Sequence, residues 1–442
     1  MNVLVRAAIA VVPPLIALAG ARPALGAQQP ATPRDSLRLA VLQTEAVHAD
    51  PRQRELALDS AASALRVRNI GTDRLPAFSA NGTGQYQSQV AAIPLALPNL
   101  SIPAPPHDTY DAHVNAQESL YNPTIAPRLG VERAQLAVSQ DQVRTTLHGL
   151  RQEVNAAFFA AATLQQRSVD IAAAVTDLQA RLSEAVDRVA AGTSLPSDTS
   201  AIEAAILQRR QDEASVGADR RAAIAQLSAL VGHTLADSDA LALPDQAAAV
   251  AAAAHELDSL RARPEYQQFA DTRAQLDREA GLDAAQLKPQ VSAFVRAGYG
   301  RPGLNPLNTA FTSYWLGGIQ FQWTPWDWGT TDRSREALAL QQQAVSDEEA
   351  AFTSQLRRSI QDDLATMEQL DSAMALDDRI IALRAQVERE TAVRLQEGVI
   401  SGSEYVDRAT DLLSARLARD DHRIALAQAR AHFLTILGVD IH

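Results

Sequence analysis

The side chains that most often do chemistry form no recognisable catalytic or metal-binding pattern in this sequence. The 442 residues include nine histidines and no cysteine, and the histidines are scattered along the chain. No HExxH, GxSxG or P-loop pattern occurs. Adjacent acids such as Asp362-Asp363 and Asp377-Asp378 are typical of solvated helix faces. The sequence therefore predicts a protein that is not an enzyme, with no cofactor and no metal site.

The composition instead indicates export. Residues 1–27 carry Arg6, an apolar run and an end rich in small residues, which together are typical of a cleaved signal peptide. No later stretch approaches the roughly 20 apolar residues of a membrane-spanning helix. The lack of cysteine excludes disulfides and thiolate metal sites. A net charge of −12 argues against nucleic-acid binding and suits an acidic lumen or a soluble protein equally well.

Landmarks of proline and glycine repeat with an offset of about two hundred residues. Chance matching is the alternative explanation, but four landmarks keep their order and nearly their spacing. We expect a first repeat at 28–245 and a second at 246–442, a period too long for a solenoid array. The matched landmarks are Pro51, Pro76, Gly192 and Gly232 in the first repeat, and Pro264, Pro289, Gly398 and Gly438 in the second.

Four segments alternate apolar and polar residues, so each would present one apolar and one polar face as a strand. Each run has about 9 to 11 residues, the length of a tilted membrane-spanning strand, and aromatic residues cluster at the ends. A half-buried soluble sheet gives the same alternation. Four strands cannot close a barrel in lipid, so several chains would have to share one. The predicted strands are 77–87, 110–120, 290–299 and 315–323.

Two segments with almost no proline or glycine, 124–191 and 330–397, predict very long helices. Apolar residues in them recur at coiled-coil spacing, for example Val143, Leu147, Leu150 and Val154. The first long helix would be retraced by helices at 197–231 and 255–283. A helix at 403–437 would retrace part of the second, and we expect the N-terminal segment 35–70 to be its missing partner.

This order of elements resembles the TolC family of outer-membrane efflux proteins, the outer membrane factors, over essentially the whole mature chain. The resemblance rests on the repeated proline segments, the turn at 325–329 (Pro-Trp-Asp-Trp-Gly), the weaker counterpart of this turn at 120–123, and the Gly-x-x-Ser-x-Ser-Glu stretch at 398–404. The resemblance implies a fold that is mainly α with membrane β. Three chains would share a twelve-stranded β-barrel on an α-helical periplasmic tunnel.

The resemblance also implies a function and partners. Such a protein is a passive exit duct in the bacterial outer membrane, part of a tripartite efflux or type I secretion system. It receives substrates from an inner-membrane transporter of RND or ABC type through a periplasmic adaptor (membrane fusion) protein. Outer-membrane lipid would surround the barrel. The sequence does not specify the cargo.

The helix-to-helix turns near residues 192–198 and 398–404 would then form the periplasmic tip, where family members carry rings of acids. The matching residues are Glu404 and Asp407, which lie three apart and so on one helical face. In a trimer, six carboxylates would favour cations and repel anions. Alternatively, both acids complement a helix N-terminus that Ser403 caps. The equivalent first-repeat residues are Asp198 and Ala201.

The residues of the two turns themselves have separate expected roles. Gly192 and Gly398 would allow the chain to reverse between helices. Their neighbours would contact the adaptor or simply cap the helices. These candidate docking residues are Thr193, Ser194, Val399 and Ser401.

The main competing interpretation is a soluble periplasmic helical scaffold or adaptor protein with a small sheet. Such a protein must cover the apolar faces of the four strands with other parts of its chain, and the sequence offers no spare apolar helix. A monomeric porin is a weaker alternative because it needs many more strands.

Overall fold

The computed structural model describes residues 36–90, 104–253, 261, 263–305 and 309–439. The expected signal peptide at 1–27 lies outside the described residues, as does most of the proline-rich loop between the first two predicted strands. Residues 36–442 form one unit. The division into two repeats at residue 245 therefore stays a proposal about the origin of the chain.

Four antiparallel strands form one sheet in the order β2-β3-β5-β6. Their register places Val114 between Ala80 and Ala297, and Ala297 beside Trp315, so one apolar row crosses the whole sheet. Because successive side chains face opposite sides, the adjacent row is polar. The strands are β2 (Ala77–Tyr86), β3 (Asp108–Tyr121), β5 (Gln290–Arg301) and β6 (Thr312–Gln322).

No other part of the described chain covers the apolar face of this sheet. Phe78 and Trp315 are each 76% exposed, and Ile319 is 72% exposed. These side chains alternate with polar residues along their strands, as the sequence predicts. A soluble sheet would bury such a face against another layer, so the exposure favours the membrane interpretation over the scaffold.

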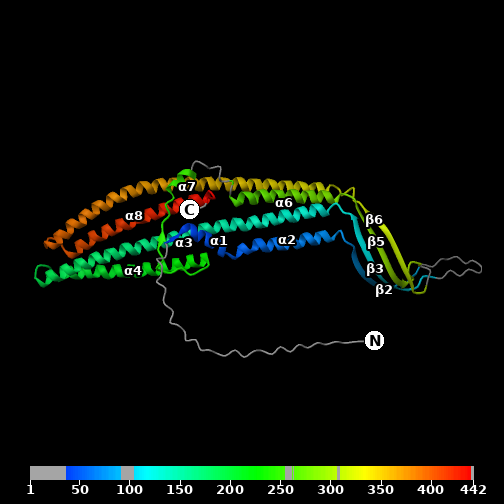
Figure 1. Cartoon of the computed structure of the whole chain (residues 1–442), viewed down its shortest axis with the longest axis horizontal. Coiled ribbons are helices and arrows are strands. Elements are labelled where there is room, and N and C mark those ends of the chain that lie inside the picture. Colours follow the sequence, from blue (N-terminus) through cyan, green and yellow to red (C-terminus); the bar gives the residue numbers. More distant parts are fainter. Residues whose placement is uncertain (1–35, 91–103, 254–260, 262, 306–308, 440–442) are drawn as a thin grey trace, which may run out of the picture. The chain divides into compact units, whose positions relative to one another are not determined.

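Two very long helices continue from the sheet, α3 (Ile125–Ala190) and α7 (Thr330–Gln396), of 66 and 67 residues. At 1.5 Å per residue each spans about 100 Å. Their interiors contain no proline after the first turn, and the residues predicted to pack at coiled-coil spacing, among them Leu147, Leu150 and Val154, are buried. α4 (Pro196–Val231) runs back along α3, and α8 (Gly402–Ile436) runs back along α7 (Figure 1).

The N-terminal segment differs from expectation in its partner. It folds as α1 (Leu39–Ala49), a 3₁₀ turn η1 (Pro51–Arg54) and α2 (Glu55–Thr72), and α2 packs against α3. The prediction that this segment joins the helix at 403–437 in retracing the second long helix is therefore wrong within the chain. α2 leads into β2, which pairs with β3, so the helices attached to these neighbouring strands are also neighbours.

The place beside α7 is taken by α6 (Pro264–Gln286), which packs on both α3 and α7. The sequence places the start of this helix too early, at residue 255. In the structure Pro264 occupies its first turn, where the missing N–H of proline costs nothing. A short helix, α5 (Ala247–Ala253), precedes it.

Two cores hold the helices together. The larger joins α1, the middle of α3 and the ends of α4 and α8, together with part of α7 and the small parallel pair β1 (Leu37–Arg38) and β4 (Leu241–Ala242). The smaller core, built around Ile202, Leu395 and Tyr405, lies near the helix-to-helix turns. We call the boundary where α3 meets α6 and α8 the seam, because it joins the N-terminal half of the chain to the C-terminal half.

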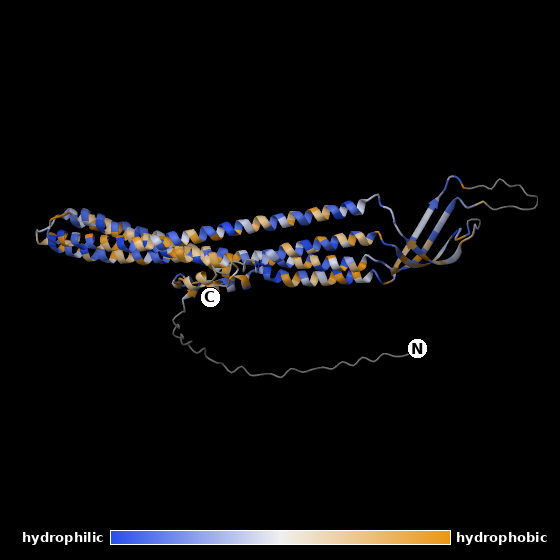
Figure 2. Ribbon diagram, turned by 90° about the horizontal axis from the view of Figure 1, so that it is seen from above, coloured by the Kyte–Doolittle hydropathy of each residue, from blue (hydrophilic) through white to orange (hydrophobic). Residues whose placement is uncertain are grey.

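Hydrophilic and hydrophobic residues are interleaved along the long helices in Figure 2. Each helix buries a stripe rather than its whole surface, as expected for rods that pack side by side. None of the described helices combines the length and the hydropathy that crossing a membrane requires.

Candidate functional site at the helix-to-helix turns

The two turns at the ends of α3 and α7 share one backbone design. Gly192 and Gly398 adopt left-handed φ angles of 74° and 72°, which glycine tolerates without strain. The Thr193 N–H donates to the Arg188 carbonyl, and the Val399 N–H to the Arg394 carbonyl, each at 2.9 Å. These are Schellman-type caps. The two glycines therefore reverse the chain as the sequence predicts.

Asp198, at the start of α4, ties the first turn to the second. Its side chain accepts the Gly402 N–H at 2.7 Å through Oδ1. Through Oδ2 it accepts the Ser194 hydroxyl at 3.0 Å and the Leu195 N–H at 3.3 Å. The residue is only 7% exposed. One carboxylate thus satisfies the start of its own helix and an N–H at the start of α8.

The surroundings of Asp198 favour its charged form. Burial alone would raise the pKa of this carboxyl, but the Gly402 N–H, the Ser194 hydroxyl, the Leu195 N–H and the charge of Arg188 hold the pKa below its usual value. Hydrogen bonds to a carboxylate stabilise the ionised state. Asp198 is therefore a structural anion and takes no part in a solvent-facing ring.

Gly402 makes this close approach possible. A Cβ atom on it would lie 2.6 Å from the Asp198 carbonyl oxygen and 2.8 Å from the Asp198 Cα. Real Cβ contacts are longer than this, so a larger residue would push the two turns apart. The sequence alone gave no reason to single out Gly402, because its constraint comes from a residue 204 positions away.

Glu404 and Asp407, the predicted constriction residues, are both exposed on α8. The Glu404 N–H donates to the Ser401 hydroxyl at 3.3 Å, and Ser401 has the extended backbone of an N-cap. The expectation that Ser403 is the N-cap is therefore wrong. Ser403 lies within the first turn, with its hydroxyl 2.9 Å from that of Ser401. Among the described residues, no ion pair engages Glu404 or Asp407.

Tyr405 lies next to Glu404 but faces the opposite way. It is fully buried, and its hydroxyl lies 3.0 Å from Asp177 Oδ2 on α3 and 2.9 Å from Glu388 Oε1 on α7. The Arg181 guanidinium lies 5.8 Å from the ring centroid. Burial and the two carboxylates raise the pKa of the Tyr405 phenol well above its usual range. The hydroxyl is therefore a permanent donor that links three helices.

Further polar contacts join the ends of α3 and α7. The Arg188 guanidinium donates to the Leu395 carbonyl, and the Gln396 amide donates to Glu184 Oε2 at 3.2 Å. The sequence alone does not predict which residues hold the tip together. These contacts join residues far apart in the chain; Tyr405 and Asp177, for example, are 228 residues apart.

The candidate docking residues occupy different environments. Thr193 and Ser401 are exposed, while Ser194 is half-buried and bonded to Asp198. Val399, which follows Gly398, is 68% exposed, and Leu195, the N-cap of α4 in the first turn, is 66% exposed. Two apolar side chains are thus presented to solvent beside capping residues. In the part of the chain that the structure describes, no three His, Asp or Glu side chains are placed to hold a metal ion.

Comparisons by sequence found no match among family models or curated proteins. Comparison of structures found close matches over nearly the whole chain. CusC, described for its transmembrane channel formation, is 16% identical, with 94% of this chain and 99% of that one covered and a TM-score of 0.68. The outer membrane protein VceC of Vibrio cholerae is 14% identical, covering 91% and 97%, with a TM-score of 0.67.

A third match is the open state of the MtrE outer membrane channel of Neisseria gonorrhoeae. It is 18% identical, covers 91% of this chain and 89% of that one, and has a TM-score of 0.65. Identities this low establish the fold alone. The long paired helices and the four-stranded sheet confirm the predicted fold class, and the chain has the fold of the TolC-type outer-membrane channels.

Proposed function

We propose that this protein is the outer-membrane exit duct of a tripartite efflux or type I secretion system. It passively conducts substrates that an inner-membrane transporter of RND or ABC type delivers through a periplasmic adaptor. The observation that carries the proposal is the uncovered sheet, whose apolar face and two free edges suit lipid and further copies of the chain. The fold shared with outer-membrane channels supports the same conclusion.

The edges of the sheet indicate how copies assemble. β2 and β6 are the outermost strands of the sheet, so each has backbone groups without a strand partner among the described residues. In lipid every such group must be paired. Pairing β6 of one copy with β2 of the next would close a barrel, and three copies of four strands give the twelve-stranded barrel that the family resemblance implies.

The helical part supports the same assembly. α7 is an edge of the helical layers and carries an exposed apolar stripe with steps of four, three and four residues, as coiled-coil packing requires. α2 and α4 at the opposite edge expose Leu58, Leu65 and Leu207. We infer that α2 and α4 of a neighbouring copy cover α7, which supplies in trans the partner that the chain lacks. The stripe is Leu376, Ile380, Leu383 and Val387.

Glu404 and Asp407 are the residues we propose for the pore constriction. Their exposure on the first turns of α8 supports this role, because a ring of carboxylates must face a solvent-filled opening to act on ions. Three copies would bring six carboxylates together. The equivalent Asp198 is buried and Ala201 is uncharged, so the first repeat contributes nothing to this ring.

The first test is native mass spectrometry of protein extracted with detergent from outer membranes. We expect a species of three chains. A monomer recovered from the soluble periplasm would overturn the duct and favour the scaffold.

Single-channel recording tests the constriction. We expect the double variant Glu404→Ala/Asp407→Ala to lose cation preference, while Glu397→Ala, which removes an exposed tip carboxylate outside α8, retains it. Equal preference in all three proteins would contradict the ring.

The adaptor would dock at the turns, with Thr193, Ser194, Val399 and Ser401 as proposed contacts. Exposed apolar Val399 and Leu195 support this surface. A photo-reactive residue at position 399 should crosslink to a periplasmic adaptor protein, whereas one at exposed Leu340 should not. Crosslinks from position 340 alone would move the docking surface away from the tip.

A further inference from the structure

Two aspartates of α3 face aspartates across the seam. Asp141 lies against Asp271 of α6, and Asp170 lies against Asp420 of α8. In both cases one carboxyl comes from the N-terminal half of the chain and the other from the C-terminal half. Like charges in contact repel each other, so the fold must compensate for both pairs.

In the first pair Asp141 is enclosed and Asp271 is half-buried. The Asp141 side chain is 1% exposed, and its Oδ1 accepts the Arg144 guanidinium at 2.6 Å. Its Oδ2 is buried and has no hydrogen-bond partner. Across the seam, Asp271 Oδ2 accepts the Gln267 amide at 3.1 Å. A buried acceptor without a donor is costly, and a proton on one of the two carboxyls would supply that donor.

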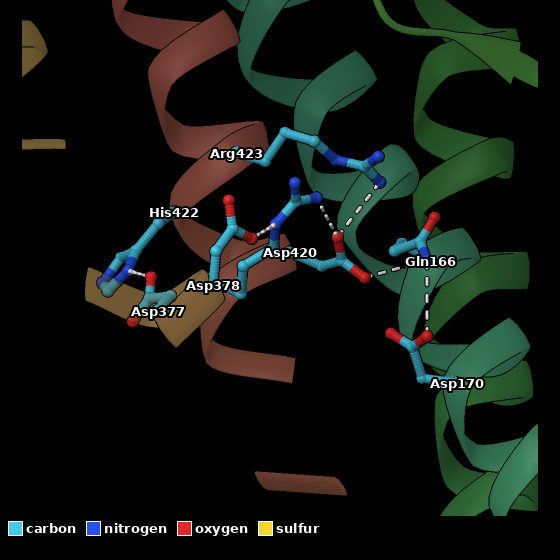
Figure 3. A network of polar contacts seen from close by, with 8 residues as sticks. Gln166, Asp170, Asp377, Asp378, Asp420, His422 and Arg423 are labelled. Atoms are coloured by element: carbon cyan, nitrogen blue, oxygen red, sulfur yellow. Dashed lines mark hydrogen bonds and ion pairs between the residues drawn. The ribbon is translucent and has the colours of Figure 1, made fainter. Parts of the chain in front are cut away.

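The Asp170 pair repeats this arrangement nearer the tip (Figure 3). The Gln166 amide lies between the carboxyls, 3.4 Å from Asp170 Oδ1 and 3.0 Å from Asp420 Oδ2. Arg419 and Arg423 both approach Asp420 Oδ1 at 3.3 Å. Asp170 Oδ2 is buried and again has no partner. The donors in Figure 3 reach both oxygens of Asp420 and Oδ1 of Asp170, but none reaches Asp170 Oδ2.

We propose that each pair, Asp141–Asp271 and Asp170–Asp420, is a proton-binding site that holds one shared proton across the seam. Loading both sites joins the two halves of the chain by carboxyl-to-carboxylate hydrogen bonds. Losing the protons as pH rises leaves two pairs of facing anions. The seam is thus clamped in acid and loosened in alkali.

The titration of the carboxyls supports this geometry. Burial, followed by the charge of Asp420, raises the pKa of Asp170 to about 6, against a lowering effect of Arg416 on α8. Burial and Asp271 likewise raise the pKa of Asp141, against the lowering effect of Arg144. An acid with a raised native pKa stabilises the fold below its unfolded value, and that stability is lost as pH rises through the native value.

Polar and charged groups on the other packed helices make hydrogen bonds to other residues. On α4, Arg220 donates to Gln165 Oε1 at 3.5 Å and to the Asp239 carbonyl at 3.1 Å. On α7, Asp378 accepts Arg419 at 3.1 Å. On α2, Ser60 accepts the Gln140 amide next to Asp141. Among the described residues, none of these contacts reaches Asp141 Oδ2 or Asp170 Oδ2.

A metal ion is a poorer occupant than a proton. Within the described residues neither pair has a third His, Asp or Glu at ligand spacing. Arg144 and Arg423 also already place positive charge on the carboxylates. A divalent cation would add to that charge with too few oxygens to replace its water.

The functional consequence rests on the proposed duct. The Asp170–Asp420 pair joins α3 to α8, so in the proposed duct a shared proton restrains movement of α8 relative to α3. We therefore expect acid to restrain opening. Proton binding itself can be measured whether or not the protein conducts.

The test is infrared spectroscopy of the full detergent-solubilised protein between about pH 5 and about pH 8, a range that brackets the raised carboxyl pKa. We expect wild type to show absorption from protonated carboxyls at about pH 5 that is lost by about pH 8. Asp141→Asn and Asp170→Asn should each remove about one protonated group per chain. Asp271→Asn and Asp420→Asn place the amide on the other side of each pair and should also remove about one protonated group each. They replace the first two variants if those fold poorly.

Exposed Asp347 provides the matched control, and Asp347→Asn should leave the signal unchanged. Full protonated-carboxyl signal in all four seam variants would overturn the proposal, as would loss of the wild-type signal on adding magnesium or calcium chloride. Bilayer conductance is recorded in parallel. Conductance that falls in acid for wild type but not for Asp141→Asn/Asp170→Asn supports the clamp. If the protonated-carboxyl signal is present but no conductance is recorded, the proposed duct is contradicted and the proton-binding sites are not.

Discussion

The two helix-to-helix turns have the same backbone and different chemistry. Both end a long helix with a left-handed glycine and a Schellman cap. At equivalent positions the first turn carries Asp198, buried and bonded to the second turn, and the second carries Glu404, exposed and without an ion pair among the described residues. Next to them Thr199 bonds only its own helix, whereas Tyr405 links three helices.

This difference shows that two turns with the same backbone conformation can carry equivalent side chains in different environments. One carboxylate holds the tip together because it has exchanged water for three protein donors. The other is exposed and keeps its hydration, which the proposed ring of carboxylates requires. Equivalent position in a repeat therefore predicts conformation much better than it predicts the role of a side chain.

The largest effect should come from Gly402→Ala. Its new Cβ would overlap the backbone of Asp198, and we expect the tip to lose about 1–3 kcal/mol of local stability, as overpacking usually costs. Gly217→Ala in α4 is the control, because a Cβ there meets open space and should be neutral or stabilising. Hydrogen exchange of the tip amides measures both. Equal protection in the two variants would show that the turns are not in tight contact.

Removing the buried acid should cost more than removing the exposed one. Asp198→Ala leaves the Gly402 N–H without its acceptor, and we expect a loss of about 2 kcal/mol in tip protection. Glu404→Ala should stay within about 0.5 kcal/mol of wild type. Limited proteolysis at the turns ranks the two variants. The reverse ranking would contradict the division of roles between the turns.

Tyr405→Phe should have a moderate effect. It removes the hydroxyl that lies against Asp177 and Glu388, and we expect a loss of about 1 kcal/mol, typical of one hydrogen bond. The equivalent Thr199→Val removes only a bond within α4 and serves as the control. Hydrogen exchange of α3 and α8 near the tip should rise in the first variant alone.

Protonation of Asp198 should have the smallest effect on tip stability at ordinary pH. Its lowered pKa means that its contribution to stability is present above the unfolded value and is lost only as pH falls through the native value. Tip protection should therefore persist to about pH 4 and decline below it. Asp198→Asn should remove that acid-dependent decline. A decline centred near neutral pH in wild type would instead point to another group.

Local features of the fold could be predicted from the sequence. The alternation in 77–87 and 315–323 assigns the strand faces because side chains alternate sides whatever the tertiary context. The near absence of proline and glycine predicts the long helices, and Gly192 and Gly398 mark their ends. Each of these properties depends on residues close together in the chain. The sequence was less reliable at Pro264 and Ser401, where neighbouring residues compete for the same helix boundary.

Only the tertiary structure decided which side chains meet. Asp198 reaches Gly402 across 204 residues, and Tyr405 reaches Asp177 across 228. The packing of α2 on α3 follows from strand order, and the pairing of Asp141 with Asp271 follows from where α6 docks. Residue type and periodicity determine local conformation, but whether a carboxylate is a buried anchor, a proton site or a solvated charge depends on burial and donors that only the packed helices supply.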